Sequence, residues 1–179
     1  MKKKSGFTLI ELLVILMLIG ILVFLNLGVG ESVTANSRIT GLINNFMADF
    51  SAAKQLAAAE NRYVAITFST DGRSYTVQKL ADNDSVDGVL YNDWTTVKTV
   101  TPFSDRPFFN TGAVSNFAVN STGVVRVLEV DGSVDISNNP DNVSLVFFIR
   151  KGRGVSTDPI AYQRTIQIFP YGGLKVEKH

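Results

Sequence analysis

One carboxylate in this 179-residue chain occupies an unusual position for a charged group. Glu11 is the only charged residue in an apolar run that covers residues 7–27. A carboxylate inside such a run costs up to a few kcal/mol in an apolar medium, and residues of this kind usually pair with a positive group. We therefore predict that Glu11 forms an ion pair.

The densest basic cluster lies near the other end of the chain, after a predicted buried strand. Arg150, Lys151 and Arg153 are interspersed with glycines there, and Lys175 follows in the last predicted hairpin. Basic side chains on a glycine-rich loop can follow the phosphates of a nucleic acid. The formal net charge of only +1 gives no support to a nucleic-acid binder. We interpret the cluster as a solvated hairpin tip, with DNA contact through Arg150, Lys151, Arg153 and Lys175 as the alternative.

Several classes of chemistry are excluded by composition. The chain has no cysteine and one histidine, His179, which is the last residue. Thiolate zinc sites, cysteine nucleophiles and histidine-based triads are therefore excluded. The acidic residues 82–88 do not have EF-hand spacing, because Val86 stands where the third ligand should be. We predict no enzyme, no cofactor and no metal site, with calcium at residues 82–88 as a weaker alternative to a polar loop.

A long amino-terminal helix is the first element that must position these residues. The run over residues 7–27 would be about 31 Å long as a helix, which is close to one hydrocarbon thickness. The lysines at positions 2, 3 and 4 favour a cytoplasmic amino end. Apolar residues then recur at helical spacing in one stripe: Ile39, Leu42, Ile43, Phe46, Met47, Phe50 and Ala57. We predict a membrane span over residues 7–30 and an amphipathic half over residues 31–61.

The remaining residues, 62–179, have the pattern of a β-rich head. Alternating runs separated by turn residues predict strands over residues 62–69, 73–80, 95–101, 113–120, 124–130, 143–150, 162–169 and 174–177. Residues 81–92 are predicted to be a loop. The aromatic residues in the middle of the chain favour core packing over a partner-binding patch: Tyr91, Trp94, Phe103, Phe108 and Phe109. The predicted fold class is α+β, with the amphipathic half of the helix packed on an antiparallel sheet or two.

Residues 4–13, Lys-Ser-Gly-Phe-Thr-Leu-Ile-Glu-Leu-Leu, resemble the signal of type IV prepilins and type II secretion pseudopilins. The resemblance combines a basic leader that ends at Gly6, the aromatic Phe7, and Glu11 at the fifth position after the glycine. It implies that a prepilin peptidase removes residues 1–6 and methylates the new amine of Phe7. It also implies a type IV pilin-like fold. The amine of a newly docked subunit can then meet Glu11 of its neighbour, whereas in a simple signal anchor Glu11 would reach only the membrane interface.

The head resembles the GspH/FimT group of minor pseudopilins in residues 61–68, 117–123 and 165–176. This resemblance implies a structural subunit of a type II secretion pseudopilus or a type IV pilus. Its partners would be other pilins or pseudopilins, the prepilin peptidase and the inner membrane, with the head periplasmic or extracytoplasmic before filament assembly. The alternative is a DNA-binding minor pilin of natural transformation. The Gly-Arg-x-Arg pattern of such members is Gly172-Gly173-Leu174-Lys175 here, which weakens that alternative.

Overall fold

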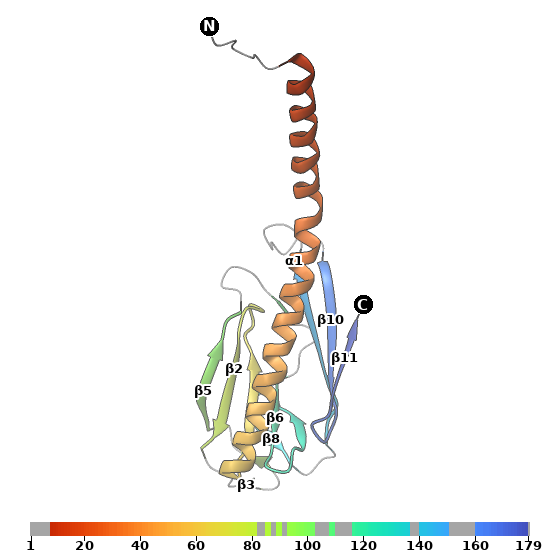
Figure 1. Ribbon diagram of the computed structural model, residues 1–179. Coiled ribbons are helices and arrows are strands. Elements are labelled where there is room, and N and C mark those ends of the chain that lie inside the picture. Colours follow the sequence, from red (N-terminus) through yellow and green to blue (C-terminus); the bar gives the residue numbers. More distant parts are fainter. Residues whose placement is uncertain are drawn as a thin grey trace.

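The computed structural model describes residues 8–81, 85–86, 89–90, 93–102, 108–109, 116–136, 140–150 and 160–178, without the side chains of residues 24–34, 85–86, 89–90 and 161. In these ranges the chain forms one long helix, α1 (Leu9–Glu60), followed by short strands. Figure 1 shows the first half of α1 projecting from the head and the second half lying along it.

The strands form three antiparallel sheets. A five-stranded sheet has the order β5-β2-β1-β6-β7, and two three-stranded sheets have the orders β11-β10-β9 and β3-β4-β8. The bounds are β1 (Val64–Phe68), β2 (Tyr75–Leu80), β3 (Ser85–Val86), β4 (Val89–Leu90), β5 (Trp94–Val100), β6 (Phe117–Val119), β7 (Val125–Val127), β8 (Val134–Asp135), β9 (Val143–Arg150), β10 (Ile160–Ile168) and β11 (Leu174–Lys178). This arrangement confirms the predicted α+β fold, with the helix packed on antiparallel sheets.

The buried stripe of α1 forms the centre of the head. The buried residues of the helix follow the predicted spacing: Ile39, Leu42, Ile43, Phe46, Phe50, Ala53 and Ala57. The ring of Phe46 lies 5.5 Å from that of Tyr75 and 5.2 Å from that of Phe147, measured between centroids. Tyr75 belongs to the five-stranded sheet and Phe147 to the sheet of β9. Phe46 therefore joins the helix to both sheets.

The helix ends where its sequence predicts, close to residue 61. Asn61 adopts a left-handed conformation with φ of 51°, and its N–H donates to the carbonyl of Ala57. Asparagine tolerates this conformation better than most residues other than glycine, because its short polar side chain forms local hydrogen bonds. The chain then turns directly into β1, which places the first strand against the helix.

Two predictions about the middle of the chain had different outcomes. Phe108 and Phe109 are buried, as the core interpretation requires, and Trp94 is half-buried with its indole N–H donating to the carbonyl of Gly132 at 2.8 Å. Tyr91 and Phe103 lie outside the described residues. The prediction of a loop throughout residues 81–92 was wrong, because β3 and β4 form there. These strands are two residues long and are completed by β8, so they leave no periodic pattern in the sequence.

Gly172, in the turn between β10 and β11, tests the contact between this hairpin and the helix. Its φ is +72°, and a Cβ atom would lie 3.0 Å from the carbonyl oxygen of Gly123 and 2.9 Å from Lys54 Nζ. We expect Gly172→Ala to lower the free energy of unfolding by about 1–2 kcal/mol.

The matched control for this substitution is Gly41→Ala, because a Cβ atom at this helical position meets nothing within 4 Å. We expect it to raise the free energy of unfolding by about 0.5–1 kcal/mol. Denaturation of the purified full chain in detergent measures both changes. Equal effects of the two variants would contradict the conformational argument.

Candidate assembly site on the projecting helix

The start of α1 is closed by a capping box that contains Glu11. The sequence Thr-x-x-Glu is the signature of this motif. The backbone N–H of Thr8 and its hydroxyl donate to Glu11 Oε2 at 2.9 and 3.0 Å, and the N–H of Glu11 donates to Thr8 Oγ1 at 3.4 Å. Thr8 therefore orients the carboxylate towards the amino end of the helix. The sequence analysis overlooked Thr8, although the signature is visible in the sequence.

The projecting half of α1 presents large apolar side chains to its surroundings. From Leu9 to Val23 these side chains are between 42% and 82% exposed. They are Leu9, Ile10, Leu12, Leu13, Val14, Ile15, Leu16, Met17, Leu18, Ile19, Ile21, Leu22 and Val23. A helix that is apolar on all sides is stable in a lipid bilayer or among other apolar helices. This half of α1 therefore needs an apolar environment that the head does not supply.

The predicted membrane segment, residues 7–30, includes residue 7 and the side chains of residues 24–30, which the structure does not describe. In the portion with described side chains, no helix is long and apolar enough to cross a membrane. The span over residues 7–30 stays a prediction.

Polar contacts along the second half of α1 join the helix to the head. Asp49 accepts a hydrogen bond from the hydroxyl of Tyr75 at 2.7 Å and pairs with Lys98 at 2.6 Å. Burial and the neighbouring Asp49 carboxylate raise the pKa of Tyr75 well above its usual range, so the phenol stays protonated. Nearer the end of the helix, Lys54 donates to the carbonyl of Gly172 at 3.1 Å. The helix is thus tied to β2, β5 and the β10–β11 turn.

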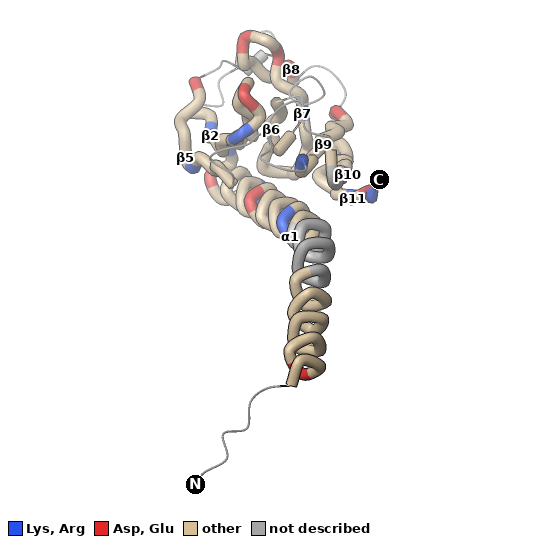
Figure 2. The backbone as a smooth tube through the Cα atoms, turned by 90° about the horizontal axis from the view of Figure 1, so that it is seen from above, with Lys and Arg blue, Asp and Glu red and all other residues tan. Residues whose placement is uncertain are grey.

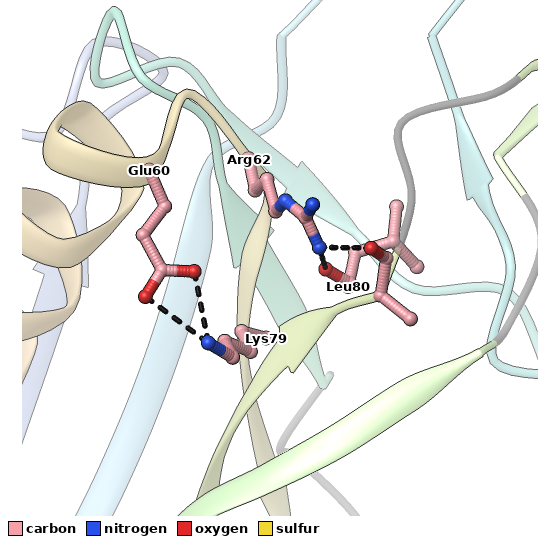
Figure 3. Close-up of polar contacts among 5 residues, drawn as sticks. Glu60, Arg62, Lys79 and Leu80 are labelled. Atoms are coloured by element: carbon pink, nitrogen blue, oxygen red, sulfur yellow. Dashed lines mark hydrogen bonds and ion pairs between the residues drawn. The ribbon is translucent and has the colours of Figure 1, made fainter.

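The end of α1 has its own attachment to the five-stranded sheet (Figure 3). Glu60 pairs with Lys79 of β2 at 2.9 Å. The guanidinium group of Arg62 donates to the carbonyl oxygens of Leu80 and Ala81 at the end of β2. Glu60 and Arg62, which lie two positions apart in the chain, therefore both contact the end of β2. Because the buried stripe and these contacts fix the helix to the head, the position of the projecting half determines where the head lies.

The predicted cleavage and methylation residues, Gly6 and Phe7, lie outside the described residues. Glu11 is described, and none of the described cations forms an ion pair with it. Its pairing with an amine of a neighbouring subunit stays a prediction. The capping box turns the carboxylate towards the amino end of its own helix.

The four basic residues of the DNA alternative do not all come together. Arg150 ends β9 opposite Ile160, whereas Lys175 of β11 lies opposite Gln167 of β10. Seven positions along β10 separate these two partners, which corresponds to about 20 Å. Lys175 pairs with Glu177 at 2.7 Å, and the Arg150 guanidinium lies over the ring of Phe148, 4.9 Å from its centroid. Lys151 and Arg153 lie outside the described residues, so DNA contact stays an alternative to the predicted solvated hairpin tip.

The sequence also left calcium binding at residues 82–88 as a weaker alternative to a polar loop. Residues 82–84 and 87–88 of the acidic loop lie outside the described part of the chain. Within the described part, no three histidine, cysteine or acidic side chains gather closely enough to hold an ion.

Comparison with known proteins first concerns the amino terminus. Residues 1–25 match the family described as the prokaryotic N-terminal methylation motif. The matched segment includes Gly6, Phe7 and Glu11, and it confirms the resemblance predicted from those residues. Among solved structures, the chain is similar to the minor pseudopilin EpsH from the type 2 secretion system of Vibrio cholerae. The sequence identity is 15%, the match covers 75% of this chain and 92% of that chain, and the TM-score is 0.46. No curated protein sequence matches the chain significantly.

Proposed function

We propose that this chain is a minor pilin or pseudopilin, a structural subunit that enters a filament through its projecting helix. The observation that carries the proposal is the methylation motif over residues 1–25, which includes the exposed apolar side chains from Leu9 to Val23. A helix of this kind buries its surface among equivalent helices of other subunits, and the head fixed to its second half then faces outwards. The role is structural, and the chain is a substrate of processing enzymes.

The proposed precursor lies in the bacterial inner membrane with its amino end in the cytoplasm and its head outside. A prepilin peptidase cleaves between Gly6 and Phe7 and methylates the amine of Phe7. The new amine lies four residues before Glu11, about one helical turn away. In the filament, the amine of one subunit pairs with Glu11 of the next. The Coulomb attraction of such a pair is about 4 kcal/mol before desolvation, for a separation of about 4 Å and an effective dielectric constant of about 20. This pair sets the axial register, which apolar packing alone defines weakly.

The head supports a place in the GspH/FimT group of minor subunits. Its β1–β2 hairpin follows the helix directly, and its closing β10–β11 hairpin packs against the helix through Lys54 and Gly172. The filament is a type II secretion pseudopilus or a type IV pilus. Crosslinking in native membranes followed by mass spectrometry separates these two, because each gives its own set of partner subunits.

Processing is the decisive test of the proposed function. The intact mass of the protein from wild-type cells is expected to lack residues 1–6 and to carry one additional methyl group. Cells without the prepilin peptidase are expected to contain the unprocessed, unmethylated chain. A Gly6→Val variant in wild-type cells serves as the matched control and is expected to keep residues 1–6. Equal masses in the two strains would overturn the assignment to either filament.

A further inference from the structure

The last strand of the head, β11, has fewer apolar contacts than the strands beside it. In the sheet order β11-β10-β9 it lies at one end, next to β10, and Figure 1 and Figure 2 both show it at the margin of the head. Its side chains are exposed or half-buried, and among them Leu174 packs against the core. In contrast, β10 contributes the fully buried Ile166 and Ile168. Few buried apolar contacts are typical of a segment that opens locally.

The turn that precedes β11 is the place where this hairpin meets the helix and the five-stranded sheet. Lys54 Nζ of α1 donates to the carbonyl of Gly172 at 3.1 Å. On the other side of the turn, the N–H of Val125 at the start of β7 donates to the carbonyl of Pro170 at 2.8 Å. Gly172 comes two positions before Leu174, the first residue of β11. The hydrogen bond from Lys54 therefore acts at the start of β11, whereas the bond from Val125 acts near the end of β10.

The hydrogen bond from Lys54 has a charged donor. The side chain is half-buried, and its ammonium lies 5.8 Å from the centroid of the Phe50 ring. None of the ion pairs between described side chains includes Lys54, and its hydrogen bond goes to the backbone of the turn. Hydrogen bonds from charged donors are stronger than those between neutral groups. Gly172 leaves room for the ammonium, since a Cβ atom there would lie 2.9 Å from Nζ.

We propose that β11 is a locally opening strand and that the hydrogen bond from Lys54 to Gly172 holds it in place. Release of this bond frees β11 and leaves the adjacent edge of β10 without its strand partner. Backbone groups on such an edge can pair with another extended segment. β10 itself stays in the head, because it pairs with β9 and its apolar side chains are buried. The opening involves the head alone and is independent of filament assembly.

Hydrogen exchange of the full chain in detergent, followed by mass spectrometry, tests the opening. The amides of β11 that pair with β10 are expected to exchange faster than those of β9. Their exchange is also expected to depend more weakly on denaturant, because a local opening exposes less surface than global unfolding. Identical exchange rates and denaturant dependence for the paired amides of the two strands would overturn the proposal.

The variant Lys54→Met removes the charged donor and keeps an unbranched stem. The hydrogen bond to Gly172 is absent both after local opening and after global unfolding. Lys54→Met is therefore expected to raise the exchange rates of β11 and of β9 by the same factor, about tenfold for one hydrogen bond from a charged group. Unchanged exchange of β11 in this variant would overturn the role of Lys54.

The matched control is Tyr75→Phe, which removes the hydrogen bond to Asp49 at the five-stranded sheet. Opening of β11 leaves that hydrogen bond intact, whereas global unfolding breaks it. Tyr75→Phe is therefore expected to raise the exchange rate of β9 and to leave that of β11 unchanged. An equal rise in both strands would show that β11 exchanges only when the whole head unfolds, which would overturn the local opening.

Discussion

Glu11→Gln is expected to lower incorporation of the subunit into filaments by roughly 10- to 100-fold, as the loss of a partly desolvated ion pair predicts. Glutamine also satisfies the capping box, since its side-chain oxygen can accept from the N–H of Thr8. The variant therefore removes the charge and keeps the start of the helix. The measurement is the fraction of the protein recovered in sheared filaments relative to membranes, after the mass of the mature chain has confirmed normal processing.

The matched control for this experiment is Thr8→Ser, which retains a hydroxyl at the capping position. We expect it to assemble normally, since serine forms the same box. Normal incorporation of Glu11→Gln would show that the carboxylate charge does not set the register between subunits. Reduced incorporation of both variants would assign the effect to the helix start and not to the ion pair.

Phe46→Ala is expected to lower the free energy of unfolding by about 3–5 kcal/mol. Phe46 is fully buried, and its ring packs against Phe68, Tyr75 and Phe147. Truncation leaves a cavity at the point where the helix meets both large sheets, and rings held by their own strands cannot fill it. Chemical denaturation of the full chain in detergent, followed by circular dichroism and Trp94 fluorescence, measures the change.

Asn45→Ala provides the control for Phe46→Ala, because Asn45 is the exposed neighbour on the same turn of helix. Its effect is expected to stay within about 0.5 kcal/mol. A loss below about 1 kcal/mol for Phe46→Ala would contradict the role of this ring as the junction. A large loss would also be expected to reduce filament incorporation, since the head would no longer be held in one position on the helix.

Because the described contacts that attach the head lie in the second half of α1, the two halves of the helix can have different roles. Its second half contributes a buried stripe and the polar contacts of Asp49 and Lys54, while none of the described side chains from Leu9 to Val23 belongs to the core of the head. In the proposed function, the projecting half is thus available for lipid before assembly and for other helices afterwards. Exchange between two apolar surroundings requires no rearrangement of the head, because the two halves have separate contacts.

The sequence by itself determined the elements whose signals are local. The helical stripe from Ile39 to Ala57 and the alternation in β1 and β2 predicted their structures, since each pattern repeats over several residues. The amino-terminal motif and the capping box of Thr8 and Glu11 are likewise formed by residues close together in the sequence. For this reason the fold class and the end of the helix were predictable before the structure, whereas the role of Glu11 in assembly stays a prediction.

Only the tertiary structure decided which distant side chains meet. The strand register places Arg164 beside Lys178 and separates Arg150 from Lys175, although the sequence grouped the last two as one basic site. The two-residue strands β3 and β4 exist because β8 is available to complete their sheet. Register and pairing depend on how segments far apart in the chain pack together, and no local periodicity encodes that choice. The separation of Arg150 from Lys175 is therefore a property of the folded head.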